Sequence, residues 1–193
     1  MKKSFIVPGI IIVALIVIAG GLWIINGKNL MTSTFNQGNF AVLKTNKGDI
    51  EIKLYYDKAP IMSENFAKLA SDGKYNNTIF HRVINGFMIQ GGDYEYSNGT
   101  GGKAWDGSFL ADEIVPGLSH VRGTVSMANK GPNTNGSQFF IVQKDALFLD
   151  GRYSIFGEVV SGMDIVDQIA QVPTDGTDKP MEPITIQEVI LKN

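Results

Sequence analysis

Three short stretches of the sequence carry the side chains best suited to chemistry. Residues 80–93 (FHRVINGFMIQGGD) hold one cation, two large apolar groups and one amide within nine residues, namely Arg82, Phe87, Met88 and Gln90. Residues 127–140 (MANKGPNTNGSQFF) add amides and aromatic rings, and residues 148–153 (FLDGRY) add further apolar and aromatic surface. Glycine and asparagine favour turns, so the middle stretch is expected to form a tight loop. The chemistry available to such a set is hydrogen bonding from a permanently charged guanidinium beside an apolar surface.

The composition removes several other chemistries. The chain has no cysteine, which excludes disulfides, thiolate metal sites and cysteine nucleophiles together. Its only histidines are His81 and His120, so a histidine-rich metal site is poorly supplied. No G-x-S-x-G sequence supports a Ser/His/Asp hydrolase. Residues 99–102 are glycine-rich but lack the lysine and the strand–helix context of a phosphate-binding loop, so a turn is the preferred interpretation.

A mostly β fold is expected to position these stretches. Ile50, Ile52 and Leu54 alternate with charged residues, which is the pattern of a strand with one buried face. Further short apolar runs, separated by glycine-rich turns, lie at 79–84, 87–90, 124–128, 138–143, 153–159 and 184–191. Many short strands in a chain with 22 glycines predict a closed barrel or a sandwich, because closure removes exposed strand edges.

Two helices are expected among these strands. Pro60 suits a first helical turn, Phe66 and Leu69 recur on one face, and residues 72–73 (DG) end the pattern. A second short helix is predicted at 163–170. Two helices among so many strands fit a barrel with one helix over each open end.

The N-terminus predicts a membrane anchor. Residues 5–25 include no charged side chain over 21 positions, enough for a helix to cross about 30 Å of hydrocarbon. Lys2 and Lys3 precede this run and should stay cytoplasmic, which sends the rest of the chain across the membrane. We interpret residues 1–25 as an uncleaved anchor with an extracytoplasmic domain behind it. The alternatives are a cleaved signal, which would leave a secreted protein, and a buried core helix.

The remainder divides into a linker and one domain. Residues 26–39 are polar and rich in Asn, Gly, Ser and Thr, which predicts a flexible tether before a domain at 40–193. Beyond the apolar segment the chain carries 15 basic and 19 acidic residues, a balance that gives no reason to expect nucleic acid as a partner.

Residues 40–191 closely resemble the cyclophilin family of peptidyl-prolyl cis-trans isomerases. The strings FHRVINGFMIQGGD and MANKGPNTNGSQFF carry the resemblance, in matching order and spacing. It implies a closed eight-stranded antiparallel β-barrel capped by two α-helices, with a proline-binding groove on its surface. With the predicted transmembrane helix, we interpret the chain as a membrane-anchored, bacterial-like member whose catalytic domain is monomeric.

The resemblance also implies roles by motif position. Arg82 matches the catalytic arginine. The floor and walls of a proline pocket match Phe87, Met88, Phe140 and Leu149. The groups that hold the substrate backbone match Gln90, Asn129 and Gln138, with Ala128 lining the adjoining groove.

Two further substrate-binding positions depart from the best-known pattern of the family. Phe148 stands where a tryptophan often lines the cyclosporin-contacting edge, and Tyr153 stands where a histidine is common. Losing an indole N–H donor should weaken the binding of cyclosporin while leaving an aromatic surface for substrate. We therefore expect weak sensitivity to cyclosporin with isomerase activity retained.

The implied reaction is rotation about X–Pro bonds, and it requires no nucleophile, metal or other cofactor. We expect an enzyme that acts on proline-containing segments of secreted or membrane proteins. Two rival functions stay open: a membrane-tethered module that binds proline peptides without turnover, and a structural subunit of an envelope complex. His81 is expected to have a structural, hydrogen-bonded role, and Phe80, Phe139 and Phe156 are expected in the core.

Overall fold

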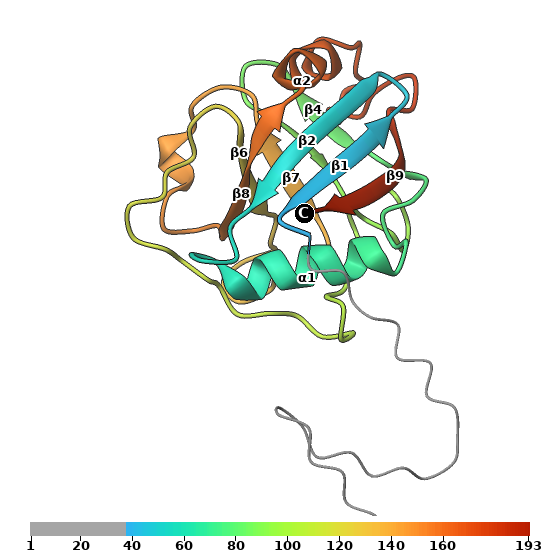
Figure 1. The fold of residues 1–193 in the computed structure, drawn as a ribbon. Coiled ribbons are helices and arrows are strands. Elements are labelled where there is room, and N and C mark those ends of the chain that lie inside the picture. Colours follow the sequence, from blue (N-terminus) through green and yellow to red (C-terminus); the bar gives the residue numbers. More distant parts are fainter. Residues whose placement is uncertain (1–37) are drawn as a thin grey trace, which may run out of the picture. The chain divides into compact units, whose positions relative to one another are not determined.

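A curved, nine-stranded antiparallel sheet is the framework of residues 38–193, the part of the chain described by this computed structural model (Figure 1). Neighbouring strands pair in the order β3-β9-β1-β2-β8-β6-β7-β5-β4. Their bounds are β1 Phe40–Thr45, β2 Gly48–Leu54, β3 Thr78–Ile79, β4 Arg82–Ile84, β5 Met88–Gly91, β6 Thr124–Met127, β7 Phe139–Val142, β8 Ile155–Ser161 and β9 Thr185–Lys192. The strand positions predicted from the apolar runs are confirmed to within a few residues, except at residues 79–84.

Period-2 alternation sets which side chains enter the core. On β2, Ile50, Ile52 and Leu54 are buried, as predicted. Leu43 and Ala41 on β1 lie directly opposite Ile50 and Ile52, so that each pair buries both members. β6 and β7 are buried at every position. On β7 the core covers one face and a second apolar cluster covers the other, whereas the outward residues of β6, Thr124 and Ser126, bond to Ser119 and His120.

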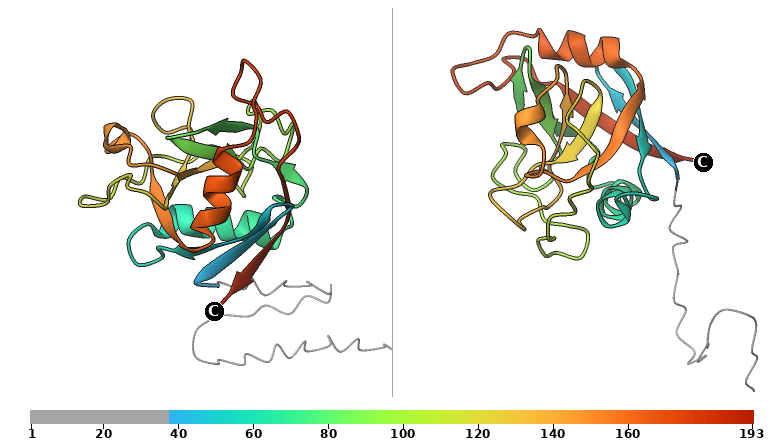
Figure 2. Two further views of the ribbon diagram at one scale, coloured as in Figure 1. Left: turned by 90° about the horizontal axis from the view of Figure 1, so that it is seen from above. Right: turned by 90° about the vertical axis from the view of Figure 1, so that its left-hand side faces the viewer.

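Two α-helices lie at opposite ends of the curved sheet, as both Figure 1 and Figure 2 show. They are α1 (Pro60–Ser71) and α2 (Met163–Ala170), and both match the predicted positions. On α1, Phe66 is completely buried; its ring lies 4.8 Å from that of Tyr75 and meets Phe139 edge-on at 5.3 Å. Gly73 follows the helix at φ 66°, a conformation that glycine adopts without strain, so the DG signal for the helix end is confirmed.

The prediction of a closed eight-stranded barrel is wrong in strand number and in closure. Residues 79–84 form two strands rather than one, because the pairing partner changes at Phe80 and His81. β3 pairs with β9, β4 pairs with β5, and within residues 38–193 no ladder joins β3 to β4. The two edge strands, β3 and β4, are therefore joined by the backbone of Phe80 and His81 and not by a ladder of hydrogen bonds. Phe80 donates its N–H to the carbonyl of Ile184 at 2.9 Å and turns its ring into the core.

Within residues 38–193 no helix combines the length and apolar character needed to span a membrane. The predicted anchor at 1–25 and the predicted linker, apart from its last two residues, lie outside the described part of the chain.

Both histidines are buried in the folded protein. His81 lies between β3 and β4 and His120 precedes β6; they are 6% and 0% exposed. His81 is buried, but its expected hydrogen-bonded role is wrong, because neither of its ring nitrogens has a hydrogen-bond partner among the described residues. Burial is the main effect that lowers the pKa of each imidazole.

These lowered pKa values predict a loss of stability under mild acid. In the unfolded chain each histidine titrates near its ordinary pKa of about 6.5. Below that pH the unfolded state therefore binds more protons than the folded state does. The free energy of unfolding should therefore be greatest above about pH 7 and should fall between about pH 7 and pH 5. Urea unfolding across this range measures the slope. His81→Gln and His120→Gln should each reduce it, and a wild-type protein whose stability is flat or rises on acidification would contradict the expectation.

Candidate active site

Three of the predicted site residues, Arg82, Gln90 and Phe140, lie in one row of paired residues that crosses four neighbouring strands. Arg82 on β4 is directly opposite Gln90 on β5, which is opposite Phe140 on β7, which is opposite Ser126 on β6. Directly paired residues share a face of the sheet, so all four side chains point away from the hydrophobic core. Sheet register thus brings the arginine of one motif beside the phenylalanine of another.

A pocket of about 150 Å³ opens beside this row. Its lining comprises nine of the eleven predicted residues, namely Arg82, Phe87, Met88, Gln90, Ala128, Asn129, Phe140, Leu149 and Tyr153. Met88, Phe140 and Leu149 are the most deeply buried of these, at 2–8% exposure, and they belong to the second apolar cluster of the fold. The arrangement can accept a small apolar ring against its floor while the half-exposed guanidinium stands at its edge.

The ring of Phe140 packs against the buried ring of His120, a contact that the sequence did not predict. The ring of His120 stacks on Phe140 at 5.9 Å with a 14° tilt, and the ring of Tyr153 meets Phe140 edge-on at 5.6 Å. His120 Nδ1 lies 2.7 Å from the carboxylate of Asp150, and its Nε2 lies 3.2 Å from the hydroxyl of Ser126. His120 and Asp150 are 30 residues apart, so no local spacing pattern could have linked them.

Burial shifts the pKa values of the two ionisable groups in this network, His120 and Asp150, in opposite directions. Burial lowers the pKa of His120, which the carboxylate of Asp150 only partly offsets. Burial acts to raise the pKa of Asp150, but hydrogen bonds from the side chain and backbone of His120 bring it below its ordinary value. A neutral imidazole therefore bridges the carboxylate and the hydroxyl and fixes the ring beneath Phe140.

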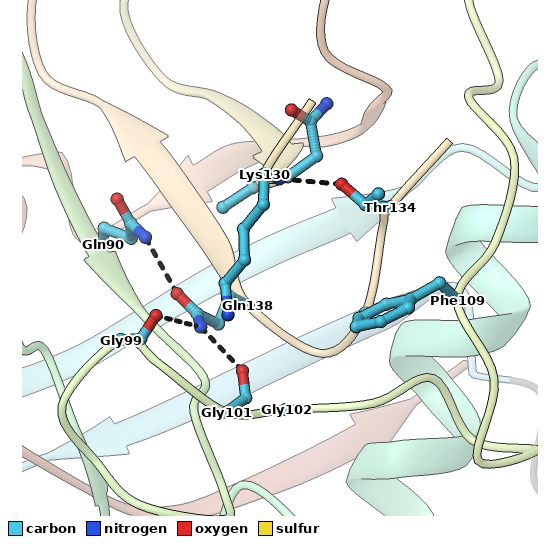
Figure 3. Close-up of a pocket in the computed structure, with 11 residues that line it drawn as sticks. Gln90, Gly99, Gly101, Gly102, Phe109, Lys130, Thr134 and Gln138 are labelled. Atoms are coloured by element: carbon cyan, nitrogen blue, oxygen red, sulfur yellow. Dashed lines mark hydrogen bonds between the residues drawn. The ribbon is translucent and has the colours of Figure 1, made fainter. Parts of the chain in front are cut away.

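A second hollow, of about 160 Å³, adjoins the pocket and shares Gln90, Ala128 and Asn129 with it (Figure 3). The side-chain amide of Gln138 donates to the carbonyls of Gly99 and Gly101 at 2.9 and 2.8 Å and accepts from the amide of Gln90 at 2.9 Å. Gln138 therefore lies in the adjoining hollow and not beside Arg82. The glycine-rich residues 99–102 lie beside the groove as bends and irregular backbone, whereas the turn lies just before them, at residues 94–96.

Asp93 organises this turn and was also missed by the analysis of the sequence. Its completely buried carboxylate accepts backbone N–H bonds from five residues at 2.9–3.2 Å, namely Glu95, Tyr96, Asn98, Gly99 and Gly101. Burial acts to raise the pKa of Asp93, but the backbone donors of Tyr96, Gly101, Asn98 and Gly99 together lower it below its ordinary value. Asp93 ends the first motif, yet only the folded loop shows that its partners follow it directly.

Phe148 lies outside the pocket. Its side chain is 67% exposed, and its ring packs against Phe87 at 5.6 Å, so it extends the rim rather than the floor. Within residues 38–193 no group of three or more histidine, aspartate or glutamate side chains is arranged to hold a metal ion.

The sequence and the fold of this chain are both similar to those of known proteins. The sequence model described as "Cyclophilin type peptidyl-prolyl cis-trans isomerase/CLD" matches residues 40–191. The chain belongs to the cyclophilin-type peptidyl-prolyl cis-trans isomerase family.

Similar proteins carry the same description. "Peptidyl-prolyl cis-trans isomerase 9" of Schizosaccharomyces pombe is 52% identical over 151 residues, which are 77% of this chain and 24% of that protein. "Peptidyl-prolyl cis-trans isomerase-like 1" of Neurospora crassa is 47% identical over 145 residues, which are 75% of this chain and 88% of that protein. This chain thus spans about a quarter of the length of the first of these relatives. Both organisms are eukaryotic, so they lend no support to the bacterial-like assignment, which stays a prediction.

Solved structures are similar as well. The crystal structure of a Cryptosporidium parvum cyclophilin-type peptidyl-prolyl cis-trans isomerase matches with a TM-score of 0.78 and 39% identity, covering 81% of this chain and 98% of that one. A second crystal structure of that protein, in the presence of the dipeptide Ala-Pro, matches with a TM-score of 0.77.

Replacing Asp93 should loosen the turn beside the groove. Asp93→Asn removes the charge and turns an amide donor toward backbone N–H groups, so we expect a loss of about 1–3 kcal/mol in the free energy of unfolding. Amide hydrogen exchange at Gly99 and Gly101 should quicken at the same time. Urea unfolding and exchange measured by NMR test both effects.

Asp106→Asn is the matched control, because Asp106 accepts from the backbone and hydroxyl of Ser108 in an exposed turn. It should change neither quantity appreciably. Equal behaviour of the two variants would contradict the organising role of Asp93.

Proposed function

We propose that this protein catalyses cis–trans isomerisation of X–Pro bonds in polypeptides, with Arg82 as its catalytic residue. The single observation that carries the proposal is the placement of the Arg82 guanidinium at the edge of a pocket floored by Met88, Phe140 and Leu149. Family membership supports the same activity. The catalytic domain acts as a monomer in this proposal.

The barrier to be lowered comes from amide resonance. Rotation about an X–Pro bond costs about 18–20 kcal/mol because the C–N bond has partial double-bond character. At the twisted transition state the resonance is lost and the prolyl nitrogen regains a lone pair. A donor that reaches this nitrogen stabilises the twisted form more than either planar isomer, which is the requirement for catalysis.

Arginine suits this task because it stays charged at every physiological pH and presents several N–H donors in a rigid fork. Its place on β4 fixes its backbone, and pairing with Gln90 across the strands sets its direction. The pocket holds the proline ring against Phe140 while the other side of the bond rotates. Burial of that ring also excludes water from the nitrogen that Arg82 approaches.

The polar groups along the groove suit the substrate backbone. Gln90 and Asn129 line both the pocket and the adjoining hollow, so an extended peptide that enters the pocket would pass them. Gln138 is held by the carbonyls of Gly99 and Gly101 and in turn orients Gln90. Backbone contacts of this kind favour proline-containing segments broadly rather than one sequence.

The proposal includes an extracytoplasmic location, with residues 1–25 as anchor and 26–39 as tether. Its support is the uncharged run of 21 residues preceded by Lys2 and Lys3. The clients are then proline-containing segments of secreted or membrane proteins, for which uncatalysed isomerisation takes tens to hundreds of seconds. A secreted protein after signal cleavage is the alternative.

A tethered module that binds proline peptides without turnover is the second candidate function. The same pocket would serve it, but it gives no account of a guanidinium placed at the pocket edge. The structural-subunit alternative has no observation in its favour.

Arg82→Ala should lower kcat/KM on a short X–Pro peptide by about 100-fold, since removal of one transition-state donor costs on that order. Arg82→Lys keeps the charge but loses the fork of N–H donors, so its kcat/KM should lie between those of the wild type and Arg82→Ala. The measurement is a coupled isomerisation assay with the full-length chain in detergent. Lys47→Ala, in the exposed β1–β2 turn, is the control and should match the wild type.

A wild type that binds the peptide without accelerating its isomerisation would remove the enzyme proposal and favour the binding module.

Cyclosporin should inhibit the wild type weakly, and Phe148→Trp should strengthen inhibition. A tryptophan on this exposed rim adds one N–H donor, and one hydrogen bond corresponds to about fivefold to tenfold in affinity. Inhibition titrations with the isomerase assay measure this. Leu147→Trp places the same ring on the neighbouring exposed residue and should leave inhibition unchanged. Nanomolar inhibition of the wild type would contradict the expectation.

A further inference from the structure

We propose that Asp178 is a positioning residue for Arg82. In this proposal its carboxylate holds the guanidinium through Nε and leaves the terminal amino groups free for the substrate. The inference rests on the proposed isomerase function and deepens it by assigning a role to a residue outside the three motifs.

The contact itself is an ion pair at the edge of the pocket. Arg82 Nε donates to Asp178 Oδ2 at 3.4 Å, and the two side chains are 43% and 45% exposed. Among residues 38–193, Asp178 supplies the one carboxylate within 4.0 Å of this guanidinium. Arginine has five N–H donors, and Nε carries just one of them. Engaging Nε therefore restrains the side chain while four donors stay available.

The loop that carries Asp178 is built to hold a fixed shape. It joins α2 to β9, and Asp175 is its centre: the Asp175 carboxylate accepts from the backbone of Thr177 at 2.8 Å, from its hydroxyl at 2.7 Å and from the backbone of Lys179 at 3.1 Å. The N–H of Asp175 also donates to the carbonyl of Lys179 at 2.8 Å. These bonds surround Asp178 on both sides along the chain.

The same loop is attached to the strand of Arg82. The N–H of Val83 donates to the carbonyl of Asp178 at 2.8 Å, so the backbone of Asp178 lies beside the residue that follows Arg82. Asp178 has φ 65°, a conformation that aspartate and asparagine tolerate far better than most residues. A bond to β4 and a left-handed backbone together direct this carboxylate to a guanidinium 96 residues away in the sequence.

Asp178→Asn is the appropriate variant because asparagine keeps the left-handed backbone and the carbonyl while removing the charge. Exposed ion pairs contribute modestly, so we expect kcat on an X–Pro peptide to fall about two- to fivefold with little change in KM. Raising the ionic strength should narrow the difference from wild type, because salt screens the pair. Asp72→Asn removes an exposed carboxylate just after α1 and should leave kcat unchanged.

A second readout reports on the guanidinium directly. In NMR spectra of the full-length protein in detergent, the Arg82 Nε–H signal, assigned by its loss in Arg82→Ala, should shift and exchange faster with solvent in Asp178→Asn. It should be unaffected in Asp72→Asn. A role confined to loop stability would leave this signal in place.

The outcomes separate the two proposals. Lower kcat together with an altered Nε–H signal supports the positioning role. If wild type is active and Arg82→Ala is not, but Asp178→Asn shows unchanged or higher kcat or an unaltered signal, the positioning role is overturned and the isomerase function stands. If wild type does not accelerate isomerisation, both are overturned.

Discussion

The strict alternation of side chains across β4, β5, β7 and β6 is the constraint on which the site depends. One row of paired residues, Val83, Ile89, Ile141 and Val125, faces the core with 0–2% exposure. The next row, beginning with Arg82, faces outward to the pocket. A slip of one residue in any of these pairings would exchange the rows, placing a guanidinium in the core and an aliphatic side chain at the pocket. Burial of the inner row therefore fixes the position of the outer one.

Buried polar groups fix the conformation of the loops, as register fixes the positions of side chains on the strands. Asp93 gathers five backbone donors from the turn that follows it, and His120 links Asp150 and Ser126 beneath Phe140. A buried carboxylate or imidazole is costly unless its hydrogen bonds are satisfied, so each of these groups disfavours other loop arrangements. The pocket walls are consequently held by polar networks, although the pocket itself is largely apolar.

The seam between β3 and β4 lies next to the same site. At Phe80 and His81 the strand leaves its pairing with β9 and takes up pairing with β5, and Arg82 is the first residue of the new pairing. The loop that precedes β9 bonds to the edge strand β4, because the N–H of Val83 donates to the carbonyl of Asp178. Arg82 therefore lies where two ends of one sheet meet, which explains why a loop distant in sequence can reach its side chain.

The sequence by itself determined the local elements, the three motifs and nine of the residues that line the pocket. Period-2 and helical patterns report which face of a segment is apolar, and that information is local, so the strands around Ile50 and the helix after Pro60 could be predicted. The split of residues 79–84 could not, because it depends on which strand each half pairs with. The displacement of Gln138 into the adjoining hollow and of Phe148 to the rim likewise depends on neighbours from other segments. Tertiary structure alone brought Asp93, His120 and Asp178 to the site, since each acts through hydrogen bonds or ion pairs whose partners only folding assembles.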